Sequence, residues 1–501
     1  MDAIYEVHGL TKRYGRTAAL NGVDFAVTPG KLVGLLGPNG SGKTTLMKIS
    51  AGLLQPTAGS VIIDKVPVGV FTKAVTSYLP DRMALPTEFT ADDAVSLYAD
   101  FFTDFDKVKA NAMLADLHIG GRDKIDSMSK GTQEKMQLCL TMSRAARLYL
   151  LDEPLGGVDP AARDYILSTI MHNYSEDAAL MLSTHLIGDI EKVLDAGRGH
   201  SFTGRQGPAP DRRRRAARGN RGERGRLLPG GLQMLTKLLR YEFKSTGRVV
   251  LPIAAGVLVL NIFTNILSHF VQNTSDRLPL AGVAMALLAL ASAVSLLVVL
   301  AICFFIEIQQ FYRLLGERGY LMLALPVPIW QHIAAKVICG TVWTLFGMVF
   351  FTLCGMLTTD TVSGSGFALD FSRVTAEDVA IWSAMLLIIL ALIAGALLHA
   401  YLACAFAAQF TQQRLLISIA AYFVIGFIGQ MAALVTAVFV AFRGYKYLNN
   451  TNFSAASFFG PDNTLGVIVL PLLAVFALVA LVDVLLWALT QWLMTKRLNL
   501  A

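Results

Sequence analysis

Charged residues are scarce in this chain of 501 residues. Asp, Glu, Lys and Arg together make up 16% of it, whereas an average soluble domain has about 25%. The deficit lies in the second half, because residues 249–492 are mostly apolar while residues 1–195 have the mixed composition of a soluble α/β domain. Length and composition therefore predict at least two domains of different kinds.

Cysteine is also rare. The five cysteines show no paired or metal-type spacing, and four of them lie in apolar stretches; they are Cys139, Cys303, Cys339, Cys354 and Cys404. This pattern predicts small buried side chains in a reducing compartment. The chain does not open with a signal-peptide pattern, so we expect the N-terminal domain to stay in the cytoplasm.

The positive net charge of +7 comes from one short segment. Residues 197–233 hold ten Arg against only two acids, and without them the chain has 33 basic and 34 acidic residues. The basic balance is therefore local, and it gives no reason to expect a nucleic-acid partner.

Three regions follow from this composition. Residues 1–195 alternate short apolar runs with helical patterns, and the runs 32–36, 148–151 and 179–183 predict buried strands of a largely parallel sheet. Residues 196–233 contain nine Gly, ten Arg and three Pro, which predicts a disordered join. Residues 234–501 form the third region.

The third region predicts an all-helical membrane domain. Residues 234–244 read as a basic, amphipathic interfacial helix. Six apolar runs follow, each long enough to cross a bilayer as a helix: 249–270, 280–308, 337–357, 380–405, 415–442 and 466–492. Ten basic residues fall on one side of this pattern and four on the other, so we expect six spans of the cytoplasmic membrane with both chain ends on its cytoplasmic side.

The strongest local signal is a phosphate-binding loop between an expected strand and an expected helix. It comprises Gly37, Pro38, Asn39, Gly40, Ser41, Gly42, Lys43 and Thr44, with Thr45 next. The glycines allow backbone N–H groups to face phosphate oxygens at a helix N-terminus. Lys43 is expected to reach the terminal phosphates, and the Thr44 hydroxyl is expected to ligate Mg²⁺.

A second signal is an apolar strand that ends in two acids. Asp152 is expected to hold the Mg²⁺ shell, and Glu153 is expected to polarise the attacking water. Alone, such a strand end is weak evidence, but together with the upstream loop it predicts ATP binding and hydrolysis.

These residues resemble the ATP-binding cassette (ABC) transporter family, with a P-loop NTPase fold. Ser129, Gly131 and Gln133 match the family's signature, whereas Lys130 and Thr132 depart from it. The resemblance implies that this helix N-terminus contacts ATP on a second subunit, so a homodimer or heterodimer is expected. Ser129 is also typical of a simple helix N-cap.

The resemblance extends to three further positions. It implies that Tyr14 stacks on adenine, that His185 is the catalytic switch histidine, and that Asp159 lies in a loop at the dimer interface. The family usually has Gln where this chain has Asp81. A carboxylate there can still approach Mg²⁺, but its charge predicts slower or differently coupled hydrolysis.

The membrane half resembles a six-span ABC-2-like export permease. Residues 311–326, expected between the second and third spans, resemble the cytoplasmic loop of such permeases and are the expected coupling element. Among polar residues inside spans, Glu307 is expected to face water at a span end. Asp483, midway along the sixth span, is expected to contact substrate or to pair helices. The expected substrate is amphiphilic, peptidic or drug-like.

The join admits a second interpretation. After Asp195 the family's β-hairpin is replaced by Arg/Gly-rich sequence, and Met234 resembles the start of a separate permease. Two adjacent genes joined by a frameshift would give this pattern; a basic linker lying on anionic lipid is the rival explanation.

The function that the motifs and the spans favour is an ATP-driven export half-transporter. The alternatives are a non-transporting fusion with impaired ATPase and a membrane sensor or resistance module.

Overall fold

The structure is a computed structural model, and it describes residues 2–155, 160–173, 177–185, 199–203, 231–272, 279–316, 319–363, 375–410, 413–450 and 468–496. The chain divides into two compact units. The N-terminal unit holds Met1–Lys237, Arg313–His332 and Thr495–Ala501, and the helical unit holds Leu238–Tyr312 and Ile333–Met494. A segment from between the second and third expected spans therefore belongs to the N-terminal unit.

The N-terminal unit contains an antiparallel sheet that the sequence did not predict. Its strand order is β2-β1-β4-β5, with the bounds β1 (Tyr5–Tyr14), β2 (Thr17–Val27), β4 (Ala58–Ile63) and β5 (Val66–Pro67). Residues of β1 alternate between buried and more exposed positions over Tyr5–His8, as expected for a sheet with one face on the core.

The second sheet is parallel and confirms the expected strands. Its order is β6-β7-β8-β3-β9, with the bounds β3 (Leu32–Leu36), β6 (Thr76–Leu79), β7 (Leu148–Asp152), β8 (Ala179–Thr184) and β9 (Gly199–Thr203). Every residue of β7 and β8 is buried, because both faces of the sheet are covered. The carboxyl ends of β3, β7 and β8 therefore meet at one edge.

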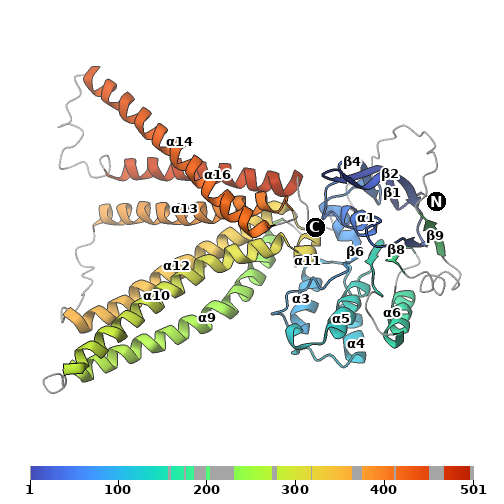
Figure 1. The fold of residues 1–501 in the computed structure, drawn as a ribbon, viewed down its shortest axis with the longest axis horizontal. Helices are drawn as coiled ribbons and strands as arrows, with labels where there is room; N and C mark the ends of the chain where they lie inside the picture. Colours follow the sequence, from blue (N-terminus) through green and yellow to red (C-terminus); the bar gives the residue numbers. More distant parts are fainter. Residues whose placement is uncertain are drawn as a thin grey trace. The chain divides into compact units, whose positions relative to one another are not determined.

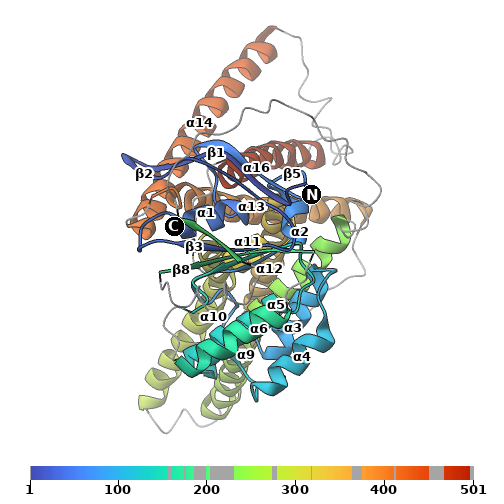
Figure 2. The ribbon, with the colours of Figure 1, turned by 90° about the vertical axis from the view of Figure 1, so that its right-hand side faces the viewer.

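Helices cover both faces of this parallel sheet. The N-terminal unit contains α1 (Lys43–Ser50), α2 (Val70–Val75), α3 (Ala91–Phe101), α4 (Lys107–Asp116), α5 (Lys130–Met142), α6 (Pro160–Asn173) and α11 (Gly319–Ala324). Helix α1 lies between the two sheets (Figures 1 and 2). Helices α5 and α6 lie on the other side, where Leu138 and Ile170 join the strand residues Tyr149 and Leu180 in one buried cluster.

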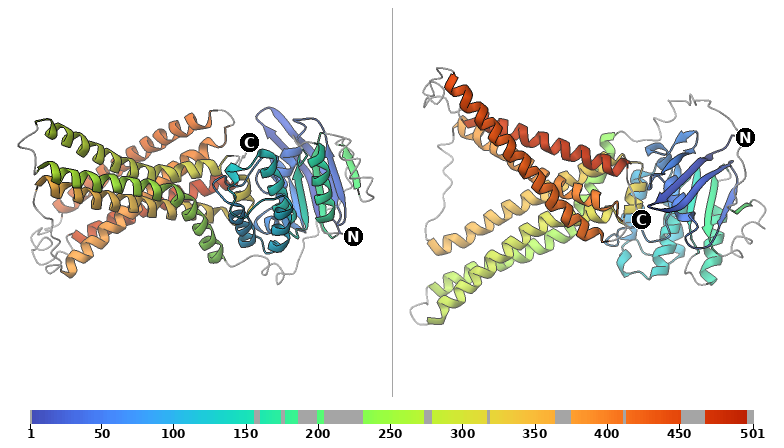
Figure 3. Two further views of the ribbon diagram at one scale, coloured as in Figure 1. Left: turned by 90° about the horizontal axis from the view of Figure 1, so that it is seen from below. Right: turned by 45° about the horizontal axis from the view of Figure 1, so that its top comes forward.

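The helical unit consists of long apolar helices. They are α9 (Gly231–Gln272), α10 (Pro279–Leu314), α12 (Ile329–Ser363), α13 (Ala376–Ala407), α14 (Arg414–Asn450) and α16 (Leu470–Lys496). Helices α9, α10 and α12 run side by side (Figures 1 and 3), and Val250, Cys303 and Trp343 share their core. The expected interfacial helix 234–244 is not separate, because it continues into the first span as part of α9.

All six helices are long and apolar enough to cross a membrane. Their outward faces carry large apolar side chains, such as Phe305 at 62% exposure and Phe423 at 70%. In water such surface is unfavourable, and its extent indicates contact with lipid. Each of the six expected spans overlaps one of these helices, and the exact bounds of the spans stay a prediction.

Part of the expected join lies in the parallel sheet. Gly199–Thr203 form β9, which pairs in parallel with β3. The sequence predicted disorder for these five residues, and the structure instead gives a strand. Residues 204–230, on which the frameshift and linker interpretations both depend, lie outside the described residues. The boundaries of the three regions stay a prediction.

Candidate functional site

The phosphate-binding loop lies between the end of β3 and the start of α1. Gly40 and Gly42 have φ angles of 83° and 94°, a left-handed conformation that favours glycine. At Gly42 a side chain is excluded both by this φ angle and by space, because an added Cβ would lie 2.4 Å from the carbonyl oxygen of Ala19. The glycines thus give the backbone the close turn that precedes the helix.

Lys43 begins α1 and is almost fully buried, with 6% exposure. Its Nζ donates hydrogen bonds to the carbonyl oxygens of Gly37 (2.6 Å) and Pro38 (3.1 Å). The same Nζ lies 3.5 Å from a carboxylate oxygen of Glu153. The lysine is therefore held inside the loop, with its charge beside the acid at the end of β7.

Asp152 ends β7 and is fully buried. Its Oδ1 accepts hydrogen bonds from the hydroxyls of Thr44 (3.1 Å) and Ser183 (2.7 Å). Burial raises the pKa of Asp152 to about 6; the Ser183 hydrogen bond opposes this shift, and nearby Asp81 adds to it.

The other oxygen of Asp152, Oδ2, has no hydrogen-bond partner in the described part of the chain. A buried carboxylate oxygen without a partner is costly, and a cation would satisfy it. Together with the Thr44 hydroxyl it offers hard oxygen ligands, which is the donor chemistry that Mg²⁺ prefers. The residues present therefore fit a magnesium ion.

Glu153 follows Asp152 directly and has a positive φ of 47°, which is uncommon for a residue other than glycine. Its N–H donates to the Ser183 hydroxyl at 2.9 Å, and one carboxylate oxygen lies 3.2 Å from Nδ1 of His185. Ser183 thus anchors both acids. Sequence reasoning missed it; its place two residues before His185, at the end of an apolar strand, was the available signal.

The other predicted residues lie apart from this group. Ser129 caps α5, accepting the N–H of Thr132 at 3.2 Å, as the simpler interpretation expected. The Gln133 amide donates to the carbonyls of Ile125 (2.7 Å) and Met128 (3.3 Å), so it fixes the turn before the helix. Gly131 lies in the first turn of α5, where an added Cβ would have open space.

Tyr14 lies close to Thr45 of α1, whereas Asp81 lies near Asp152. Tyr14 ends β1 and is half-buried, its ring 5.2 Å from Nζ of Lys12, and burial raises its pKa. Asp81 is exposed just after β6, with one oxygen 3.9 Å from Arg82. Asp159 lies outside the described residues.

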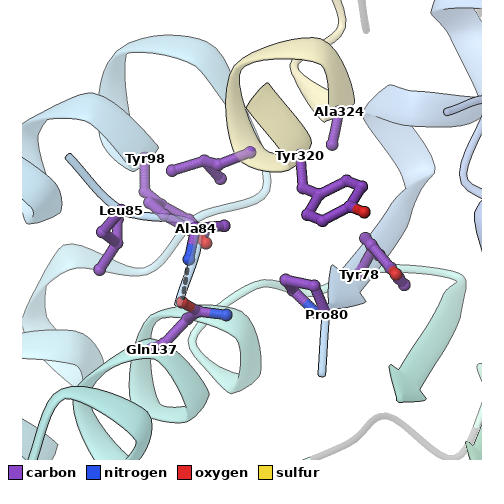
Figure 4. Close-up of a pocket in the computed structure, with 9 residues that line it drawn as sticks. Tyr78, Pro80, Ala84, Leu85, Tyr98, Gln137, Tyr320 and Ala324 are labelled. Carbon is purple, nitrogen blue, oxygen red and sulfur yellow. Dashed lines mark hydrogen bonds between the residues drawn. The ribbon is translucent and has the colours of Figure 1, made fainter. Parts of the chain in front are cut away.

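Helix α11 closes a small pocket of the N-terminal unit (Figure 4). Its Tyr320 hydroxyl accepts a hydrogen bond from Lys48 Nζ at 2.7 Å, and Lys73 donates to the carbonyl of Leu323. Only about 10 Å³ remains open, too little for more than one water. The pocket is lined by Tyr78, Pro80, Ala84, Leu85, Tyr98, Gln137, Tyr320, Leu321 and Ala324.

The helical unit contains two notable carboxyl groups. Glu307 is completely buried, so the expectation that it faces water at a span end is wrong. Asp483 packs against α13 where Gly395 leaves room, because a Cβ there would lie 2.5 Å from its Oδ1. This contact favours the helix-pairing alternative for Asp483, whose role stays a prediction.

A glycine-rich turn between strand and helix, a buried lysine in it, and two acids at the end of a neighbouring parallel strand define a nucleotide-binding domain of the P-loop class. Residues 20–156 match the family model for ABC transporters. The N-terminal unit thus contains a domain that matches ABC transporter cassettes, and the chain joins this domain to six apolar helices.

Curated relatives match this cassette. An uncharacterized ABC transporter ATP-binding protein of Bacillus subtilis, YxlF, is 29% identical over 195 residues, covering 38% of this chain and 65% of that protein. Nod factor export ATP-binding protein I of Rhizobium etli is 28% identical, covering 37% and 61%. The lantibiotic transport ATP-binding protein SrtF of Streptococcus pyogenes is 27% identical, covering 38% and 83%. The chain thus spans less than two thirds of the first two relatives.

Solved structures also match the cassette, at TM-scores too low to decide the fold. An ATP-binding subunit of an ABC transporter is 27% identical, covers 38% of this chain and 82% of its own, and has a TM-score of 0.35. A dimeric cassette in a post-hydrolysis state, bound to ADP and Pi, is 20% identical, covers 37% and 89%, and has a TM-score of 0.34.

Proposed function

We propose that this chain binds and hydrolyses ATP and that hydrolysis drives export of an apolar or amphiphilic substrate. The observation that carries the catalytic part is the convergence of Lys43, Thr44, Asp152 and Glu153 from a loop, a helix and a strand end. Cassettes of the ABC family are generally ATPases, and relatives of this one are named for Nod factor export and lantibiotic transport.

In this proposal the chain's own groups divide the work. Backbone N–H groups of residues 37–42 and the Lys43 ammonium bind the β- and γ-phosphates. Thr44 and Asp152 would hold a magnesium ion, which would neutralise charge on the phosphates. Water attacks the γ-phosphorus, Glu153 accepts a proton from it, and the bond to the β-phosphate oxygen breaks to give ADP and phosphate. His185 keeps the Glu153 carboxylate oriented, as their 3.2 Å contact supports.

The test is ATP hydrolysis by the full chain in lipid nanodiscs. For Glu153→Gln we expect the rate to fall by about 10²- to 10⁴-fold with nucleotide still bound, because general base catalysis contributes about that much. For Lys43→Ala we expect nucleotide affinity itself to fall. Asp116→Asn, an exposed acid at the end of α4, is the matched control. Hydrolysis by Glu153→Gln at the parent's rate would overturn the proposal.

The substrate class rests on a cavity in the helical unit. It has a volume of about 880 Å³ and lies among α9, α10, α13 and α14, with mostly apolar side chains such as Ile302, Phe305 and Phe423. The polar groups in its wall are few: Gln309, Tyr312, Ser418 and Tyr422. An apolar cavity with a few polar groups suits an amphiphile. Stimulation of ATPase activity by amphiphiles, absent for small polar solutes, is the expected result.

Helix α11 is the proposed coupling element. The Tyr320 hydroxyl and ring contact Lys48 of α1, the helix that begins at Lys43, and the Lys48 Nζ lies 4.6 Å from the ring centroid. Tyr320→Phe keeps the ring and removes the hydrogen bond. We expect it to reduce stimulation by amphiphiles several-fold and to leave unstimulated hydrolysis nearly unchanged. Equal stimulation in both proteins would argue against this link.

We further propose that two cassettes act together. Ser129, Gly131 and Gln133 lie at the N-terminus of α5, an end suited to contact phosphate oxygens. Hydrolysis that depends on protein concentration in detergent is the expected sign.

A further inference from the structure

The proposed transport function leaves a cluster of three buried charged residues unexplained. Glu242, Glu307 and Lys336 meet inside the helical unit, on α9, α10 and α12 respectively, and their exposures are 7%, 0% and 4%. Each lies within a helix long and apolar enough to span a membrane. Charged groups in such positions are costly, and they persist only when they are paired, neutralised or functional.

The cluster contains two carboxyl groups and one ammonium. Nζ of Lys336 lies 2.9 Å from each carboxylate oxygen of Glu242, so these two residues form an ion pair. Glu307 accepts a hydrogen bond from the hydroxyl of Thr246 at 2.7 Å through Oε1. Its Oε2 is buried and has no hydrogen-bond partner among the described residues. The single ammonium is therefore already committed to Glu242.

Among the described residues, the groups that face Glu307 supply no positive charge besides Lys336. From α9 come Glu242 and Thr246, and the Thr246 hydroxyl in turn accepts from Gln310 of α10 at 3.0 Å. From α12 come Lys336 and Cys339, and from α13 comes the buried hydroxyl of Tyr401, which donates to the carbonyl of Lys336 at 3.4 Å. All but Glu242 and Lys336 are neutral at pH 7.

The space around Glu307 is shaped for its side chain. At Gly340 of α12 an added Cβ would lie 3.1 Å from Cγ of Glu307 and 2.7 Å from Leu397. The glycine thus makes room for a carboxyl group that is sealed from solvent. An ionised carboxylate sealed in an apolar site without its own counter-ion costs far more than a neutral one.

From this charge balance we propose that Glu307 is a proton-binding site of the helical unit. The carboxyl group carries one proton while α9, α10 and α12 are packed, and Glu242 and Lys336 form the cluster's one ionised pair. A movement that parts these helices admits water to Glu307 and releases the proton, and their return takes it up again. One proton is thereby linked to the packing of three helices. This inference does not depend on ATP hydrolysis.

Infrared difference spectroscopy of the full chain in phosphatidylcholine nanodiscs at neutral pH tests the proposal. Subtracting the Glu307→Gln spectrum from that of the parent should leave the carbonyl band of one protonated carboxylic acid. The control is Glu377→Gln, which removes an exposed glutamate in the first turn of α13 and should leave no such band. Absence of the band in the first subtraction would show that Glu307 is ionised and would overturn the proposal.

A second variant tests the charge balance itself. In Glu242→Gln the Lys336 ammonium loses its partner, so Glu307 should ionise to replace it, and the protonated band should disappear although Glu307 is intact. A merely structural glutamate would not respond in this way. Persistence of the band in Glu242→Gln contradicts the proposal.

Titration of the parent protein covers the case in which a variant fails to fold. As pH rises, the Tm should first fall by several degrees and then level off as the band disappears, because the unfolded chain releases this proton at a lower pH than the packed helices do. If the carboxylic-acid band and the Tm both stay constant with rising pH until the protein unfolds, the proposal is contradicted.

Discussion

Two buried carboxyl groups, one in each unit, differ in the groups that surround them and in the ligand that could neutralise their charge. Asp152 of the cassette and Glu307 of the helical unit are both fully buried, and each has one oxygen without a hydrogen-bond partner in the described part of the chain. Around Asp152 lie the Thr44 hydroxyl and the phosphate-binding loop, which fit a magnesium ion and a nucleotide. Around Glu307 lie packed helices, which seal the carboxyl group from solvent.

The comparison shows that the surroundings of a buried carboxyl group decide whether its unpaired oxygen binds a metal ion or the group is protonated. A strand end at the edge of a parallel sheet is open to ligands, so a buried acid there is poised for a metal ion. A site sealed by three helices in an apolar unit excludes hydrated cations, so the group is neutralised instead.

Removing the charge of Asp152 should be the most damaging change. We expect Asp152→Asn to lower Mg²⁺-dependent ATP hydrolysis by about 100-fold or more, because it removes an ionised metal ligand next to the reacting phosphate. The measurement is the hydrolysis rate over a range of Mg²⁺ concentrations, with Asp116→Asn as the matched control. A rate within twofold of the parent's would mean that Asp152 is not a magnesium ligand.

Acid pH should produce a smaller effect of the same kind. The pKa of Asp152 is raised to about 6, so its carboxylate becomes protonated as pH falls through about 6 and can no longer attract the metal ion. We expect affinity for Mg²⁺-nucleotide to fall about tenfold per pH unit below this point, and added Mg²⁺ should move the fall to lower pH.

The matched comparison for this titration is Asp152→Asn, measured in the same buffers. Titration of the nucleotide phosphates is common to both proteins, so the difference between them isolates Asp152. If the parent and the variant lose affinity in parallel, the carboxyl group does not titrate in this range.

The smallest effects should come from two glycines, one beside each site. Gly42→Ala places a Cβ 2.4 Å from the Ala19 carbonyl at a φ of 94°, and Gly340→Ala places one 2.7 Å from the end of the Leu397 side chain. We expect each to lower the unfolding free energy by about 1–3 kcal/mol. Gly42→Ala should be worse, because backbone yields less than a flexible side chain; thermal denaturation of both variants decides the order.

Glycines with open surroundings provide the control for this pair. Gly256 lies in α9, and an added Cβ there would meet nothing within 4 Å. Gly256→Ala should not lower the Tm, since alanine favours the helix. A loss as large as that of Gly340→Ala would show that the close contact is not the cause.

Much of the architecture was predictable from the sequence because its signals are local. Leu148–Asp152 is an unbroken apolar run ending in acids, and it forms the buried strand β7 as expected. The six apolar runs likewise became six long helices, since a helix satisfies its own backbone whatever packs around it. The antiparallel sheet was missed, because β1 and β2 hold irregular, mixed patterns with several register shifts.

The candidate site was predictable in part for the same reason. The loop from Gly37 to Thr44 and the pair Asp152 and Glu153 are contiguous motifs, and the structure brings them together. Ser183 was missed although it hydrogen-bonds to Asp152 and to the Glu153 backbone, because a lone serine at a strand end carries no specific pattern. Its role arises from the pairing of β7 with β8.

The sequence by itself determined the class of each half: a phosphate-binding motif between strand and helix, and six runs of apolar residues. Only the tertiary structure decided that α11 belongs to the N-terminal unit and that Glu307 is sealed beside Lys336 rather than facing water. The physical reason is that hydrophobicity and backbone preference act over a few neighbouring residues. By contrast, Lys336 and Glu242 lie 29 and 65 positions from Glu307 in the chain, and only the packing of whole helices brings them beside it.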